Sequence, residues 1–152
     1  MNNQITITKT TSENPDFINL IAVFDAYLWA KYPELKTNYW GNNILEINPN
    51  VIIVYLDEKP VACACFKKYN KNTIEIKRMF VSPEARGLGL AQRILQELEL
   101  WASELGYSYS VLETLQNQTA AIALYQKAGY AIVDNYEPYV GLEMSVCMRK
   151  KI

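Results

Sequence analysis

Residues 73–91 read TIEIKRMFVSPEARGLGLA, an apolar run that gives way to a glycine-rich turn. The β-branched first half predicts a strand over 73–81, which Ser82-Pro83 ends. The turn, Arg86-Gly87-Leu88-Gly89-Leu90-Ala91, comes directly before a segment with helical periodicity. Free amides at the start of a helix, together with the helix dipole, favour a phosphate or pyrophosphate. The turn therefore indicates either a phosphate-binding loop or a tight strand-to-helix connection without a ligand.

Two known phosphate motifs do not fit this turn. Gln92 stands where the dinucleotide fingerprint needs its third glycine, and the lysine and Ser/Thr of the Walker motif are missing. The pattern Arg-x-x-Gly-x-Ala instead resembles the acetyl-CoA pyrophosphate loop of the GNAT superfamily of N-acetyltransferases, Gln/Arg-x-x-Gly-x-Gly/Ala. Residues 75–81 resemble the strand before that loop in the family, and residues 121–130 (AIALYQKAGY) resemble its later helix.

The rest of the chain alternates between apolar strands and amphipathic helices. Strands are expected at 4–8, 51–55, 61–66, 73–81, 107–113, 130–133 and 145–148, and helices at 14–32, 90–105 and 119–127. Residues 34–50 are ambiguous between a loop and a helical turn at 44–47. The resemblance implies an α/β (α+β) fold in one GNAT-like domain over residues 1–152. Its mixed central sheet of about six to seven strands is splayed in the middle and flanked by about four helices.

Composition narrows the function before any site is chosen. The 152 residues suit one domain, and 15 Lys+Arg against 16 Asp+Glu argue against nucleic acid or an anionic membrane as the main partner. The absence of histidine excludes Ser-His-Asp and Cys-His catalysis. Cys63, Cys65 and Cys147 form no disulfide framework and are interpreted as small buried hydrophobes in a reducing cytoplasm. The N-terminal residues carry no signal-peptide pattern.

The resemblance implies acetyl-CoA as co-substrate and no metal. The backbone amides of the turn would hold the pyrophosphate, and the strand before it would splay at a bulge and pair with pantetheine. Gln118 stands where the family commonly has an asparagine that contacts the cofactor, so this contact is altered or lost. The implied cofactor-binding residues are Met79, Phe80, Val81, Arg86, Gly87, Leu88, Gly89, Leu90, Ala91, Gln118 and Tyr125.

The family reaction is the direct attack of a free amine on the acetyl thioester. Tyr125 stands where the family often places the acid that protonates the departing thiolate, although a buried core tyrosine is the alternative. Without histidine, the candidates for the base are Glu75 and Glu113, directly or through water. The alternative is that both are solvated carboxylates at strand ends. The N–H of Val81 is the candidate oxyanion donor.

Aromatic residues are the candidates for the acceptor site. Trp29, Tyr32 and Tyr139 are the predicted acceptor-binding residues, and Tyr39, Trp40 and Tyr136 belong to the same aromatic set, although core or rim positions are the alternative. The expected acceptor is a small primary amine or amino acid, with a protein amine next. A non-catalytic acyl-CoA-binding module is the rival function, and a nucleotide-binding protein is a weaker one. The chain is expected to be a monomer or homodimer.

Overall fold

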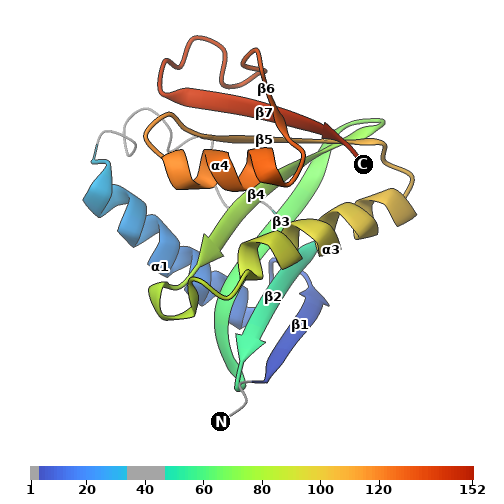
Figure 1. Ribbon diagram of the computed structural model, residues 1–152. Coiled ribbons are helices and arrows are strands. Elements are labelled where there is room, and N and C mark those ends of the chain that lie inside the picture. Colours follow the sequence, from blue (N-terminus) through green and yellow to red (C-terminus); the bar gives the residue numbers. More distant parts are fainter. Residues whose placement is uncertain (1–3, 34–46) are drawn as a thin grey trace. The chain divides into compact units, whose positions relative to one another are not determined.

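The computed structural model describes residues 4–33 and 47–152, which form a seven-stranded sheet with helices (Figure 1). The hydrogen-bonded strand order is β1-β2-β3-β4-β5-β7-β6. This confirms the predicted mixed sheet; the described residues hold three α-helices, where about four were expected. The elements are β1 (Ile5–Thr10), α1 (Pro15–Lys31), β2 (Val51–Leu56), β3 (Lys59–Asn70), β4 (Thr73–Val81), the 3-10 turn η2 (Pro83–Ala85), α3 (Leu90–Glu104), β5 (Tyr109–Leu115), α4 (Thr119–Lys127), β6 (Ala131–Val133) and β7 (Ser145–Lys151).

The chain divides into two compact units, which are taken one at a time below. Unit one consists of Met1–Cys65 and Arg78–Ala91, and unit two of Phe66–Lys77 and Gln92–Ile152. Strands β3 and β4 and helix α3 therefore each contribute residues to both units.

Unit one is built on an antiparallel hairpin with α1 packed on it. The turn between β2 and β3 has left-handed residues at Asp57 and Glu58, with φ of 50° and 69°. Helix α1 begins where predicted, because the Asn14 side chain accepts a hydrogen bond from the Asp16 amide at 2.8 Å. It ends at Tyr32, before the proline that cannot continue it.

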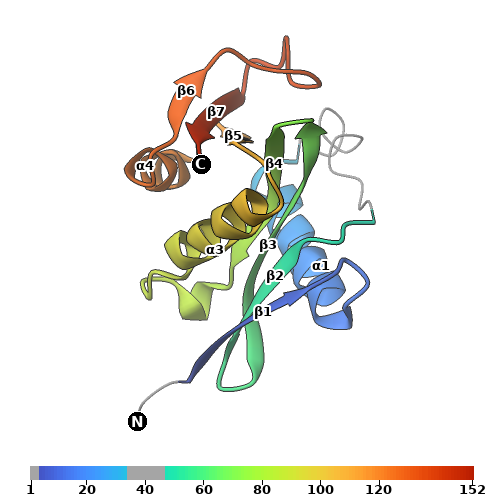
Figure 2. The same cartoon turned by 90° about the vertical axis from the view of Figure 1, so that its right-hand side faces the viewer.

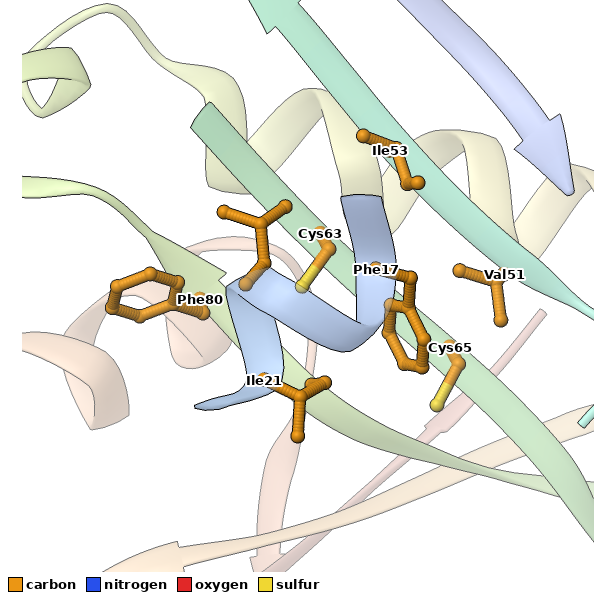
Figure 3. Close-up of a cluster of buried hydrophobic side chains, with 8 residues drawn as sticks. Phe17, Ile21, Val51, Ile53, Cys63, Cys65 and Phe80 are labelled. Carbon is orange, nitrogen blue, oxygen red and sulfur yellow. The ribbon is translucent and has the colours of Figure 1, made fainter. Parts of the chain in front are cut away.

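The apolar stripe predicted for α1 forms the core of unit one (Figure 3). Phe17, Leu20 and Ile21 are buried against β2 and β3, and Figure 3 shows the α1 side chains lying over those strands. Two of the cysteines belong to this core, as predicted for small hydrophobes. The remaining members of the cluster are Val51, Ile53, Cys63, Cys65 and Phe80.

Unit two is a sheet in which β5 lies between β4, parallel to it, and β7, antiparallel to it. Strand β6 pairs with β7 at the edge (Figure 2). The hydroxyl of Tyr130 bonds Ser110 of β5 at 2.8 Å and Glu99 of α3 at 3.0 Å, so α3 covers the Ser110 face. Since side chains alternate along a strand, Val111 and Glu113 lie on the opposite face.

Most predicted boundaries hold, and three strands differ. The predicted 61–66 strand is β3, Lys59–Asn70, because its polar end carries no apolar signal. The predicted 107–113 strand is β5, Tyr109–Leu115, since the amide of Tyr107 bonds the Ala102 carbonyl at the end of α3. Strand β7 extends to Lys151. The predicted turn at 44–47 falls mainly outside the described residues, none of whose helices is long and apolar enough to cross a membrane.

Candidate active site

The glycine-rich turn leads from η2 into the first turn of α3. Gly87 and Gly89 have φ of 83° and 74°, a region that side chains other than glycine adopt at a cost. A Cβ at either position would meet no atom of the described residues within 4 Å. Crowding therefore does not explain the glycines. The backbone conformation requires them, and the space over the backbone is open for a ligand.

Arg86 supplies the positive charge predicted beside this turn. Its Nε donates a hydrogen bond to the carbonyl oxygen of Val81 at 3.2 Å. Its guanidinium lies 5.7 Å from the centroid of the Tyr27 ring of α1. These contacts tie the turn to the end of β4 and to α1, all within unit one.

The pairing of β4 with β5 covers only the first part of each strand. Their paired residues run from Thr73↔Tyr109 to Ile76↔Leu112, whereas β4 continues to Val81 and β5 to Leu115. Arg78, two residues beyond the last pair, has a φ of 60°, which breaks the regular strand geometry. The pairs between β4 and β5 thus end at Ile76, before Arg78.

Glu75 is a buried carboxylate on the face of unit two opposite α3. It is 2% exposed, which shows the solvated strand-end alternative to be wrong for this residue. Tyr136 donates a hydrogen bond from its hydroxyl to Glu75 Oε2 at 2.8 Å, and Lys67 Nζ lies 4.0 Å from Oε1. Burial and the Glu75 charge raise the pKa of Tyr136, so its hydroxyl keeps the proton that it donates.

Glu113 is the first residue of β5 beyond the last pair with β4. Ser145 Oγ donates a hydrogen bond to its Oε2 at 2.7 Å. Burial raises the pKa of Glu113 to about 7, against the lowering effects of Ser145 and Lys77, and the Glu75 charge adds to the rise. A carboxyl group with this pKa takes up and releases a proton near neutral pH.

Tyrosines cover the face of unit two on which Glu75 lies. The rings of Tyr69 and Tyr136 are 5.0 Å apart, and those of Tyr136 and Tyr139 are 5.4 Å apart. Tyr139 is buried, and Lys77 Nζ donates to its hydroxyl at 3.5 Å. We call the two glutamates, together with these tyrosines and the polar residues that contact them, the carboxylate cluster. Its members are Lys67, Tyr69, Glu75, Lys77, Glu113, Tyr136, Tyr139 and Ser145.

Tyr125 lies in α4 with its side chain buried and its ring 6.1 Å from that of Tyr130. Burial raises the pKa of Tyr125 to about 12, and the charge of Glu113 contributes. The hydroxyl therefore stays protonated at neutral pH, as a proton donor must. Gln118 immediately precedes α4, and within the described structure its side chain makes no capping hydrogen bond.

The predicted acceptor residues are divided between the two units. Trp29 and Tyr32 belong to unit one, and Tyr139 to unit two. Tyr32 is buried at the end of α1 with Lys31 Nζ 5.5 Å from its ring, which agrees with the core alternative. Tyr39 and Trp40 lie outside the described residues.

Three polar or charged residues at these positions were not predicted. Lys67, Lys77 and Ser145 contact the two glutamates or their tyrosine partners. A sequence signal did exist for Lys77, since polar residues at alternate positions of a buried strand place Glu75 and Lys77 on one face. Ser145 carried no such signal, because its partner lies 32 positions away.

Comparison with known proteins agrees with this arrangement. The profile of the acetyltransferase (GNAT) family matches residues 15–130. An IAA acetyltransferase of Azospirillum brasilense is 30% identical over 155 residues, 97% of this chain and 98% of that protein. The chain belongs to the acetyltransferase (GNAT) family.

Solved structures share the fold. A crystal structure from Klebsiella pneumoniae, assigned to the acyl-CoA N-acyltransferases, is 29% identical with a TM-score of 0.77 and covers 97% of each chain. A GNAT family acetyltransferase from Elizabethkingia anophelis with acetyl-CoA bound has a TM-score of 0.68 at 22% identity, over 97% of this chain and 98% of that one.

Proposed function

We propose that this protein is an acetyl-CoA-dependent N-acetyltransferase that moves the acetyl group from the CoA thioester to a primary amine. The turn Arg86–Ala91 carries the proposal, since two left-handed glycines there open the backbone directly before α3. Amides at a helix N-terminus favour the pyrophosphate of CoA. The acetyl-CoA held by the Elizabethkingia anophelis acetyltransferase supports the same choice of co-substrate.

Two segments of β4 and α4 complete the proposed cofactor site. The pairs of β4 with β5 end at Ile76, and the backbone of Met79, Phe80 and Val81 is proposed to pair with the pantetheine amides. Gln118, directly before α4, and Tyr125 of α4 are proposed to contact the cofactor.

The proposed reaction is a direct displacement. The amine nitrogen attacks the thioester carbonyl carbon, the carbon–sulfur bond breaks, and CoA leaves as a thiolate. Glu113 is proposed as the base that takes the proton from the amine, because its pKa of about 7 suits neutral pH. Glu75 is the second candidate for this role. Tyr125 donates a proton to the thiolate, and the N–H of Val81 stabilises the oxyanion.

The proposed acceptor is a small primary amine or an amino acid, bound near the carboxylate cluster, with a protein amine as the next choice. Residues 1–152 are proposed to act as one acetyltransferase domain, as a monomer or homodimer. The buried thiols support a reducing compartment, and we propose the cytoplasm.

Ligand-dependent melting tests the cofactor assignment. A ligand that binds only the native state raises the melting temperature, so we expect stabilisation by acetyl-CoA and none by ATP or NAD at equal concentration. A panel of amines and amino acids then reports turnover through release of free CoA. Stabilisation without turnover on any amine would favour the non-catalytic acyl-CoA-binding module. No stabilisation at millimolar acetyl-CoA would refute the proposed enzymatic function.

A further inference from the structure

Helix α1 and strand β4 are joined inside unit one by a partly buried ion pair. Arg78 Nη1 donates to Asp25 Oδ1 at 2.6 Å. The two side chains are only 7% and 18% exposed, so water screens this pair weakly. Ion pairs held this far from solvent are costly to break on one side, because the remaining charge stays buried.

The backbone of Arg78 is the unusual feature of this pair. Its φ of 60° is one that few residues other than glycine, asparagine and aspartate adopt. A strained residue of this kind persists where its surroundings hold it in place. Two contacts do so: Asp25 binds its guanidinium, and the thiol of Cys63 donates to its carbonyl oxygen at 3.6 Å.

Helix α1 contacts β4 a second time, two residues further along the strand. The ring of Phe24 stacks on that of Phe80, with centroids 5.1 Å apart. Figure 3 shows Phe80 at the edge of the core cluster that α1 covers. Consecutive residues of α1, Phe24 and Asp25, therefore fix β4 at Phe80 and Arg78.

We propose that Asp25, acting through Arg78, is a positioning residue for acetyl-CoA. The ion pair holds Arg78 in its left-handed conformation, and this conformation directs the following backbone, Met79 to Val81, toward the cofactor. The inference rests on the proposed function. Asp25 itself touches no reacting atom in it; its effect reaches the cofactor through the conformation of β4.

Asp25→Asn keeps the size of the side chain and removes its charge. We expect the Kd and the KM for acetyl-CoA to rise about tenfold, because the binding edge of β4 is no longer preorganised. The kcat at saturating acetyl-CoA should fall by a smaller factor, because the Val81 N–H proposed for the oxyanion lies on the same edge while the base and the proton donor do not. A role in folding alone would lower the melting temperature and leave both constants unchanged.

Two substitutions of Arg78 separate the conformation from the charge. Glycine adopts a φ of 60° without steric cost, whereas alanine does not. Made in the Asp25→Asn background, Arg78→Gly and Arg78→Ala both lack the buried charges and differ only in this respect. We expect the glycine double variant to bind acetyl-CoA at least about threefold more tightly. Equal affinities would overturn the proposal, and this comparison decides it if Asp25→Asn alone does not fold.

Tyr55→Phe is the matched control for the docking of α1. The Tyr55 hydroxyl donates to Asp16 Oδ2 of α1 at 2.6 Å, but Tyr55 lies on β2, away from the proposed cofactor edge. This variant should melt at a lower temperature with an unchanged KM for acetyl-CoA. If the wild-type protein does not bind acetyl-CoA, the proposed function fails. If the wild type binds and Asp25→Asn binds equally well, only the positioning role fails.

Discussion

Tyr136 and Glu75, 61 positions apart in the sequence, are joined by a hydrogen bond of 2.8 Å from the phenol to the buried carboxylate. Tyr136 lies in the segment between β6 and β7, and Glu75 lies in β4. The bond therefore connects the C-terminal loop of unit two to a central strand. It also fixes the orientation of the carboxyl group that is the second candidate for the base.

Tyr136→Phe should destabilise the protein. The variant removes the donor and leaves a buried carboxylate with one partner fewer, which costs about 1–3 kcal/mol. Urea denaturation at neutral pH measures the loss. Tyr27→Phe is the control, because Lys31 donates to the exposed Tyr27 hydroxyl at 3.4 Å, and its removal should change the free energy of unfolding by less than about 0.5 kcal/mol. Equal effects of the two variants would show that the Tyr136 bond stabilises the protein no more than an exposed hydrogen bond does.

Gly89→Asn and Gly89→Asp should differ in acetyl-CoA affinity. Both side chains tolerate the positive φ of 74° better than other residues, and they have nearly the same shape. Aspartate adds a negative charge where the pyrophosphate is proposed to lie. We expect the aspartate variant to bind at least about tenfold more weakly than the asparagine variant. Calorimetric titration measures both, and matching affinities would place the phosphates elsewhere.

Tyr125→Phe should lower kcat by about a hundredfold or more, because the departing thiolate loses its proton donor. The KM for acetyl-CoA should change little. Tyr130→Phe is a suitable comparison, since its ring contacts Tyr125 while its hydroxyl bonds Glu99 and Ser110. That variant should lose stability and keep its kcat. A Tyr125→Phe enzyme with normal turnover would return Tyr125 to the role of a core tyrosine.

Glu113 should give the protein two opposite responses to pH. As the base it must be ionised, so kcat/KM should rise through a pKa near 7 and this limb should vanish in Glu113→Gln. Stability should move the other way. The pKa of Glu113 in the folded state lies above its ordinary value of 4.5, so the folded state holds the proton longer, and stability falls as the pH rises from about 4.5 to 7.

Unfolding in urea at pH 5 and pH 8 measures this second response. The shift from 4.5 to about 7 corresponds to a loss of at most about 3 kcal/mol for the wild type. Glu113→Gln should lose less over the same range, since its amide does not titrate. Equal changes in stability between pH 5 and pH 8 for the wild type and Glu113→Gln would contradict the raised pKa.

Local patterns predicted most of the fold. The stripe of α1, its asparagine cap and the β-branched strands are short-range features, so the bounds of α1, β4 and α4 agree with expectation closely. The two glutamates in apolar strands were also visible in the sequence, but their burial was not. That Glu75 is buried and bonded by Tyr136 depends on a loop 61 positions away, which no local pattern specifies.

The left-handed residue in β4 could not be predicted from the sequence. The resemblance implied a bulge in this strand, but no pattern identified Arg78 as the residue with a positive φ. A weak signal did exist on α1, where Asp25 lies four residues after the buried Ile21 and hence on its apolar side. A charge at that position needs a partner of opposite charge, and only the fold shows that this partner is Arg78.

The burial of the cysteines suits the protein to an assay in which an aromatic disulfide reagent detects free thiols by a colour change. Cys63, Cys65 and Cys147 are each no more than 5% exposed, and burial raises the pKa of both Cys63 and Cys147. Thiols of this kind react slowly with aromatic disulfide reagents, because the thiolate is the reactive form. The sulfhydryl of released CoA reacts fast. Turnover on any acceptor can therefore be followed continuously against a low protein background, in the native enzyme and with every cysteine in place.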